Sequence, residues 1–138
     1  MDINLTSKVL KVDEGLSLKP YFCTSDKLSI GFGRNIEDMG ITEEEAEFLL
    51  NNDIKRTTNE VIDNFPWFGG LSDVRQCVVV SMVFNLGLPK FKEFKNTIAA
   101  IEQNNFVEAA REMLDSTWAK QVGQRADRLA NAMDYDHF

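Results

Sequence analysis

The feature that most constrains the fold is an apolar segment, residues 77–84, which only Ser81 interrupts and which has clear boundaries on both sides. Ser72 and Asp73 precede it and suit a helix N-terminus, because short polar side chains accept hydrogen bonds from the free backbone N–H groups there. Gly87 and Pro89 follow it and are typical of helix ends. A helix that is apolar on nearly all sides has to be buried. The sequence therefore predicts a central helix around which other elements pack.

The chain before this segment alternates between helical and extended patterns. Residues 5–12 have helical spacing and end at Gly15, with Thr6 or Ser7 as the expected cap. Residues 18–23 and 28–33 flank the polar residues 24–27, which predicts a hairpin, and Pro20 places the first strand at the edge of its sheet. Thr42, with a glutamate three residues later, forms a capping box that begins a helix reaching about residue 61.

The chain after the central segment has helical patterns only, at about residues 96–103, 105–115 and 123–134. One helix, a hairpin and then helices alone is an α+β pattern. At 138 residues the chain fits a single domain, 1–138. We expect a small lobe of about residues 14–62 that contains the sheet, and a larger, mostly helical lobe of about residues 63–138 that also includes the N-terminal helix. A cleft between such lobes would suit a polymeric ligand.

The net charge of −7 comes from one part of the chain. Residues 37–63 hold nine acidic and two basic side chains, whereas the segments on either side are nearly neutral. Nucleic-acid binding needs a basic face, so the sequence argues against a nucleic-acid partner. A solvated helix surface is the ordinary interpretation of such a charge run.

Several features bear on where the protein works. No apolar run approaches the roughly 18–20 residues that a membrane-spanning helix needs, and residues 1–7 show no signal-peptide pattern. We therefore expect synthesis in the cytoplasm of the producing cell. In that reducing compartment the two cysteines, Cys23 and Cys77, are expected to be free thiols.

Three side chains near the predicted hairpin could carry chemistry. Glu14 ends the first helix, where the negative end of the helix dipole disfavours a second negative charge and so favours a protonated carboxyl. A glycosidase acid needs such a proton, although an exposed residue of the last helical turn is the ordinary alternative. Cys23 and Ser29 lie on opposite arms of the hairpin. The only histidine, His137, is next to the C-terminus, so a Cys/His nucleophile system and a His/Cys metal cluster are both absent from the pattern.

At this point the sequence resembles the phage lysozymes, or endolysins. The resemblance rests on the order and spacing of pieces that are individually weak. They are Glu14-Gly15-Leu16-x-Leu18-Lys19-x-Tyr21, Cys23, Ser29-Ile30-Gly31-Phe32-Gly33, Ile41-Thr42-x-x-Glu45-Ala46-Glu47, Asp73-Val74-Arg75, Met82-Val83-Phe84-Asn85-x-Gly87, Phe94-x-Asn96-Thr97, Glu108-Ala109-Ala110, Trp118 and Gln124-Arg125-Ala126-x-Arg128. Together they span residues 10–128. The resemblance implies a lysozyme-like fold.

The resemblance also implies a function. These enzymes hydrolyse the β-1,4 bond between N-acetylmuramic acid and N-acetylglucosamine in peptidoglycan, mostly with inversion, and need no cofactor or metal. Carried over, Glu14 would protonate the leaving oxygen, and Cys23 with Ser29 would act on a water on the opposite face of the sugar. Arg125 matches an arginine that supports the glutamate. Asn35, Phe84 and Thr97 match positions that bind substrate.

The resemblance further implies how such a protein is deployed. It would act as a monomer on the cell wall after release from the host cytoplasm, and a pore-forming, holin-type partner would give it access. A hydrolase mounted in a virion is an alternative that the sequence does not separate from a free lysis enzyme.

This chain departs from the family pattern at several positions. Cys23 stands where many members have Asp, and an ordinary thiol is mostly neutral at pH 7. Its thiol would orient water, ionise under local influence or attack the sugar directly. Ser29 replaces a commoner Thr, Arg34 a His, and Glu112 an Asn. These departures support a second hypothesis, a catalytically weakened peptidoglycan-binding or interaction protein on the same fold.

Overall fold

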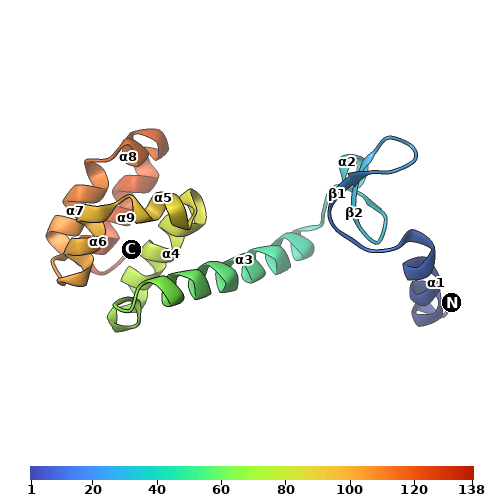
Figure 1. The fold of residues 1–138 in the computed structure, drawn as a ribbon, viewed down its shortest axis with the longest axis horizontal. Coiled ribbons are helices and arrows are strands. Elements are labelled where there is room, and N and C mark those ends of the chain that lie inside the picture. Colours follow the sequence, from blue (N-terminus) through green and yellow to red (C-terminus); the bar gives the residue numbers. More distant parts are fainter. The chain divides into compact units, whose positions relative to one another are not determined.

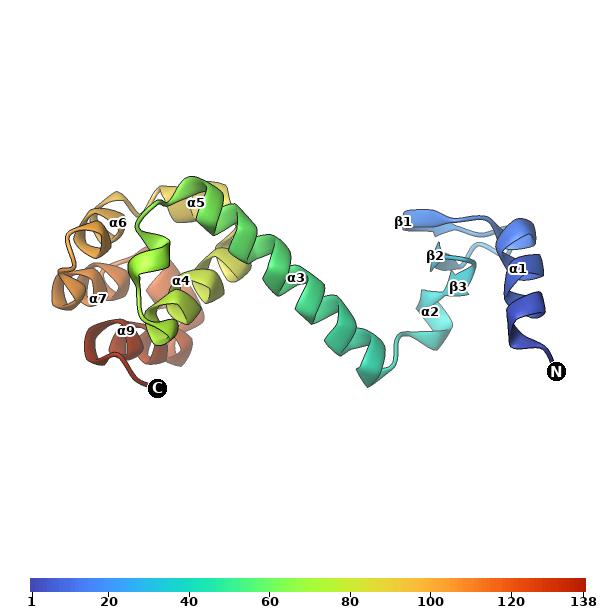
Figure 2. The same cartoon turned by 90° about the horizontal axis from the view of Figure 1, so that it is seen from below.

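A computed structural model describes all 138 residues, which form two compact units, Met1–Leu49 and Leu50–Phe138 (Figures 1 and 2). Helices predominate, and a single three-stranded antiparallel sheet lies in the first unit. The α+β class is therefore confirmed. The boundary between the units falls inside helix α3 (Glu43–Asn64). The lobe limits at about residue 62, and the grouping of the first helix with the helical lobe, stay predictions.

Helix α1 (Ile3–Glu14) begins earlier than the sequence suggested. The Asp2 carboxylate, rather than Thr6 or Ser7, caps the helix by accepting a hydrogen bond from the Leu5 backbone N–H at 3.0 Å. The expected cap was wrong because Asp2 offers the same short polar acceptor one turn nearer the N-terminus. The end at Gly15 is confirmed, and the Gly15 N–H donates to the Lys11 carbonyl.

The predicted hairpin is confirmed as strands β1 (Ser17–Phe22) and β2 (Leu28–Gly31), in which Tyr21 lies opposite Ser29. The strand order β1-β2-β3 puts β1, which contains Pro20, at the edge as expected. Strand β3 (Arg34–Asn35) and helix α2 (Ile36–Met39) were not predicted. Elements of two and four residues are too short to show a period in the sequence.

Helix α3 carries the predicted capping box. The Thr42 hydroxyl accepts from the Glu45 N–H at 3.1 Å, and the Glu45 carboxylate accepts from the Thr42 N–H at 2.9 Å. These reciprocal bonds satisfy two backbone donors that a helix start leaves free. The helix runs to Asn64, slightly beyond the predicted end.

The second unit is built around helix α4 (Asp73–Leu86), whose Ser72 cap is confirmed by a hydrogen bond from the Arg75 N–H. Cys77 and Phe84 on this helix are exposed, so the expected burial on all sides is only partly correct. The remaining elements of the second unit are the short 3-10 turn η1 (Phe68–Gly70) and helices α5 (Leu88–Lys92), α6 (Lys95–Glu102), α7 (Phe106–Leu114), α8 (Thr117–Val122) and α9 (Gln124–Tyr135). Helices α5 and α8 were not predicted, again because each is short.

The apolar core lies entirely in the second unit. Its largest fully buried side chains are Phe91, Met82, Ile101, Met113 and Met133. Helix α7 packs against α6 and α9, and α4 packs against α5 and α9. Both cysteines are free thiols, as expected. None of the helices combines the length and apolar character needed to cross a membrane.

Candidate active site

Glu14 lies at the last position of α1, and its carboxylate reaches the turn between β2 and β3. The contact is with Gly33, whose backbone has a φ of +75°. A Cβ built on Gly33 would lie only 2.8 Å from Oε2 of Glu14. The end of the first helix and the glycine turn of the sheet therefore meet at the carboxyl group, a contact that sequence spacing did not reveal.

Cys23 and Ser29 are brought together at the far end of the same hairpin. Cys23 follows β1, and its backbone N–H donates to the Lys27 carbonyl at 2.9 Å. Ser29 on β2 is 2% exposed, and its hydroxyl donates to the same Lys27 carbonyl at 3.1 Å. The Ser29 hydroxyl also lies close enough to the Cys23 sulfur to lower the pKa of that thiol. The Lys27 carbonyl thus joins the Cys23 backbone to the Ser29 side chain, a role that only its place in the turn 24–27 could have suggested.

The environment of Cys23 lowers the pKa of its thiol. Hydrogen bonds from the backbone at Lys27, and then at Ser25, lower the pKa of the Cys23 thiol. Partial desolvation raises that pKa, and the Ser29 hydrogen bond lowers it further, so the net direction is downward. A thiol with a lowered pKa carries more negative charge near neutral pH than an ordinary cysteine.

Asn35 lies opposite Ser29 across the β2–β3 pair. Its side-chain oxygen accepts from the Asp38 N–H at 3.1 Å and caps helix α2, while its amide nitrogen donates to the Asp38 carboxylate at 3.0 Å. Because both ends of the amide are engaged within the unit, Asn35 is held in a fixed orientation. Its contact with a sugar stays a prediction.

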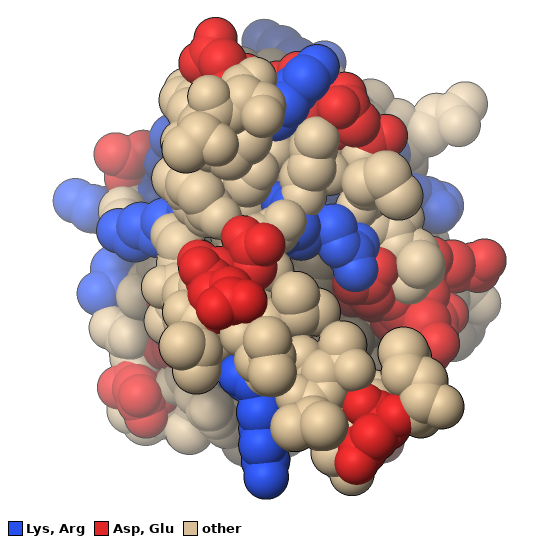
Figure 3. All heavy atoms as spheres, turned by 90° about the vertical axis from the view of Figure 1, so that its right-hand side faces the viewer, with Lys and Arg blue, Asp and Glu red and all other residues tan.

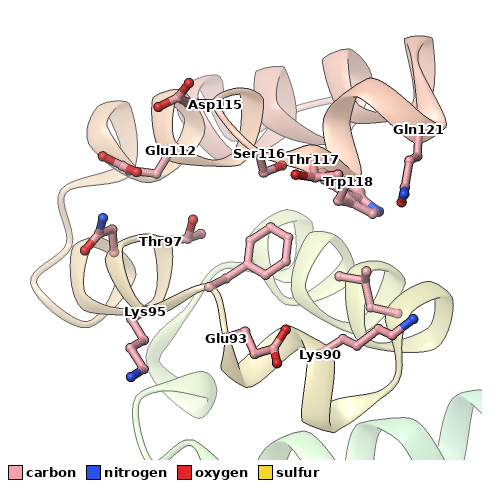
Figure 4. Close-up of a pocket in the computed structure, with 13 residues that line it drawn as sticks. Lys90, Glu93, Lys95, Thr97, Glu112, Asp115, Ser116, Thr117, Trp118 and Gln121 are labelled. Carbon is pink, nitrogen blue, oxygen red and sulfur yellow. The ribbon is translucent and has the colours of Figure 1, made fainter.

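Thr97, of the second unit, lines a cavity of about 340 Å³ between α5, α6, α7 and α8. Figure 4 shows the carboxyl groups of Glu112 and Asp115 on one side of this cavity, and Lys90 and Lys95 on the other. A pocket with both signs of charge and an aromatic wall suits a polar ligand better than an apolar one. Thr97 itself is only 2% exposed, and its contact with substrate stays a prediction.

Phe84 and Arg125 also lie in the second unit. Phe84 is 46% exposed on α4 and lines a separate hollow with Thr57 and Pro89. Arg125 is half-buried in the first turn of α9. Its approach to Glu14 stays a prediction.

Trp118 and Asn85 form a polar contact in the second unit that the sequence reading did not assign. The buried indole N–H of Trp118 donates to the Asn85 side chain at 2.8 Å. This bond joins α8 to the end of α4, next to Phe84. Both residues belong to the motifs quoted above, but a contact across this separation leaves no periodic signal in the sequence.

Some of the charged side chains form local pairs. Arg34 holds Glu45 through two hydrogen bonds, at 3.0 and 2.8 Å, and Lys27 lies 3.4 Å from both Glu37 and Asp38. On the face drawn in Figure 3, Lys and Arg are scattered among Asp and Glu. No group of three or more His, Cys, Asp or Glu side chains is arranged to hold a metal ion.

Comparisons with known proteins identify the family of this chain. The family model described as phage lysozyme matches residues 11–133. The chain belongs to the phage lysozyme family. It is 28% identical to "Probable T4-type lysozyme 1" of Dictyostelium discoideum, over 91% of each chain. It is 30% identical to an endolysin of Acyrthosiphon pisum secondary endosymbiont phage 1, over 85% of this chain and 80% of that protein.

A third relative contains the matching region as a small part of a much longer protein. The chain is 24% identical to part of the pre-baseplate central spike protein Gp5 of Enterobacteria phage T4, over 89% of this chain but 26% of that protein. Membership of the phage lysozyme family supports a lysozyme-like function, that of a glycoside hydrolase. The family was correctly identified from motif order.

Proposed function

We propose that this protein is a muramidase that hydrolyses the β-1,4 bond between N-acetylmuramic acid and N-acetylglucosamine in bacterial peptidoglycan, with Glu14 as the general acid. The observation that carries the proposal is that Glu14, Cys23 and Ser29 belong to one small unit, in which the Glu14 carboxylate lies against Gly33 and Ser29 lies beside Cys23 at the other end of the hairpin. A carboxyl group at one end of the hairpin and a polarised thiol at the other supply the two functions that an inverting glycosidase needs.

We expect inversion, as the resemblance to the phage lysozymes implies, rather than direct attack on the sugar by Cys23. Inverting glycosidases separate their two groups by about 6.5–9.5 Å, because an attacking water must fit, whereas retaining enzymes use about 5–5.5 Å.

In the proposed mechanism, Glu14 gives its proton to the glycosidic oxygen as the bond to the anomeric carbon breaks. The Cys23 thiolate, with the Ser29 hydroxyl, orients a water on the opposite face and accepts its proton as the new C–O bond forms. The lowered pKa of Cys23 supports this role, because a base must be at least partly deprotonated to act. Thr97 and Phe84 would contact the glycan, and Arg125 would support Glu14.

Replacing Glu14 tests the proposal directly. Glu14→Gln keeps the size of the side chain but removes the proton to be donated, so the release of reducing sugar from murein should fall at least about 100-fold. Asp13→Asn is the matched control, because it removes one carboxylate from the same helical turn, and it should keep activity within about twofold. Mass spectrometry of the products distinguishes a muramidase from a transglycosylase or an amidase. A fully active Glu14→Gln protein would exclude Glu14 as the acid.

The role of Cys23 is tested with Cys77 replaced by alanine, so that a single thiol remains. If the Cys23 thiolate is the base, activity rises with pH through the pKa of that thiol, which lies below its ordinary value. Cys23→Asp should extend activity to lower pH, because the ordinary pKa of aspartate is about 3.9, whereas Cys23→Ser should lose most activity. Equal activity of the serine and aspartate variants at all pH values would remove the base role.

A catalytically weakened peptidoglycan-binding protein is the second candidate, and Cys23 in place of aspartate is the observation that favours it. It predicts binding to murein sacculi with no release of reducing sugar by the wild-type protein. For the enzyme we expect a monomer that reaches the cell wall from the host cytoplasm through the pore of a holin-type partner. Lysis of permeabilised cells, but not of intact cells lacking such a partner, would support this route.

A further inference from the structure

We infer that Gly33 is a positioning residue for Glu14: its missing side chain leaves the space that the Glu14 carboxylate occupies, and so sets where the proton donor lies. This inference rests on the proposed role of Glu14. Gly33 carries no reactive group, so chemistry alone does not mark it as a candidate site residue.

The geometry at Gly33 is unusually close. A Cβ at this position would lie 2.8 Å from Oε2, 3.0 Å from Cδ and 3.2 Å from Cγ of Glu14. Carbon atoms in van der Waals contact prefer about 3.5–4.0 Å, so the carboxyl group lies against the bare Cα. Any L side chain at position 33 would move the end of the Glu14 side chain, which is flexible, more readily than it would move the backbone.

Position 33 favours glycine for a second reason: its backbone φ is +75°, a conformation that residues with a side chain rarely adopt. These two reasons can be separated inside the same hairpin. Gly31 has a nearly equal φ of +71°, but a Cβ there would have no atom within 4 Å. Alanine at Gly31 therefore reports backbone strain alone, whereas alanine at Gly33 reports strain plus displacement of Glu14.

The experiment compares Gly33→Ala with Gly31→Ala in the otherwise unchanged protein. Small displacements of a catalytic group can cost up to about 100-fold in rate. We expect Gly33→Ala to lower kcat at least about tenfold with little change in KM, and Gly31→Ala to keep kcat within about twofold. The two variants should lose similar thermal stability, because they share the strain. Equal losses of kcat would overturn the inference.

A spectroscopic measurement separates this inference from the proposed function. In protein with ¹³C-labelled glutamate, assigned through Glu14→Gln, the carboxyl signal of Glu14 should shift in Gly33→Ala but not in Gly31→Ala. That result would support the contact even if Glu14→Gln proved active and the proposed mechanism failed. An unmoved Glu14 signal in Gly33→Ala would overturn the positioning role even if Glu14 is the acid.

A double-mutant cycle completes the test. Glu14→Asp shortens the side chain by one methylene and withdraws it from Gly33, so adding Gly33→Ala to Glu14→Asp should cost less activity than adding it to the wild type. If Gly33→Ala alone fails to fold, folding of the double variant with Glu14→Ala would support the same contact. Failure of both to fold would overturn the inference.

Discussion

In the first unit Ser29 is the buried residue, whereas every buried apolar side chain belongs to the second unit. Polar contacts order the first unit: the Arg34–Glu45 pair, the Asn35 cap and the Lys27 carbonyl that two groups share. Packing of large side chains such as Phe91 and Met82 orders the second. The groups proposed to do chemistry thus lie in the unit that has no buried apolar core, where local opening is expected to need less free energy.

This contrast can be measured because the two units carry different probes. Both tryptophans, Trp67 and Trp118, lie in the second unit, so their fluorescence follows its unfolding. Hydrogen exchange of the amides in β2 and β3 follows the first unit. Coincident transitions by both probes would show that the two units unfold as one cooperative unit, and would contradict a separate, more easily opened first unit.

The largest effect is expected in the core of the second unit. Phe91 is fully buried, and its ring packs edge-on against Phe65 at 5.5 Å and stacks on Phe94 at 6.3 Å. Phe91→Ala leaves a cavity and should lower the free energy of unfolding by about 3–5 kcal/mol, measured by urea denaturation with tryptophan fluorescence. Val107→Ala, at a 66% exposed site, is the control and should stay within about 0.5 kcal/mol. A cost below about 1 kcal/mol at Phe91 would contradict the packing described.

A smaller effect is expected at Arg75, a polar clamp in the same unit. Its guanidinium donates to the Met133 carbonyl at 2.8 Å and the Asp134 carbonyl at 2.9 Å, and lies 3.6 Å from the centre of the Phe106 ring. Arg75→Ala should cost about 2–3 kcal/mol by the same denaturation assay, because charged hydrogen bonds and a cation–π contact are lost together.

The control for this clamp is Arg111→Ala. Arg111 is 72% exposed and pairs only with Glu108 on its own helix. Its loss should leave the denaturation curve nearly unchanged, because exposed ion pairs are screened by water. Equal effects of the two arginine variants would mean that the clamp does not anchor the end of α9.

The sequence predicted the elements that have strong local signals and missed those that do not. Thr42 with Glu45, and Ser72 before an apolar run, fix helix starts through neighbouring residues, so both helices were located. Helices α5 and α8 and strand β3 are too short to show a period and depend on packing or pairing with distant residues. Capping and periodicity reflect interactions between residues that are a few positions apart, so they do not reveal elements that depend on distant contacts.

The candidate site divides in the same way. Motif order singled out Glu14, Cys23 and Ser29 as candidates, because a family resemblance is itself a pattern along the sequence. The closeness of Gly33 to Glu14 and the hydrogen bonds that lower the pKa of Cys23 were not predictable, since both follow from backbone geometry. Arg125 and Phe84 rest on the resemblance alone.

The smallest effect is expected at the Arg34–Glu45 pair, and it tests whether polar contacts order the first unit. The Arg34 guanidinium, together with the Thr42 N–H, lowers the pKa of Glu45 to about 2. A carboxyl with a lowered folded pKa contributes stability above its ordinary pKa of about 4.5, and that contribution is lost as the pH falls toward 2.

Glu45→Gln should therefore speed hydrogen exchange of the Arg34 and Asn35 amides modestly at pH 6. The difference from the wild type should shrink progressively as the pH falls from 4.5 toward 2, because the Glu45 carboxylate is increasingly protonated and loses its charge. Glu44→Gln, in the same helical turn but outside the capping box, is the control. Because the pair is solvent-exposed, the effect should also weaken in high salt. A difference that persists unchanged at pH 2 would show that packing, rather than charge, holds β3 to the start of α3.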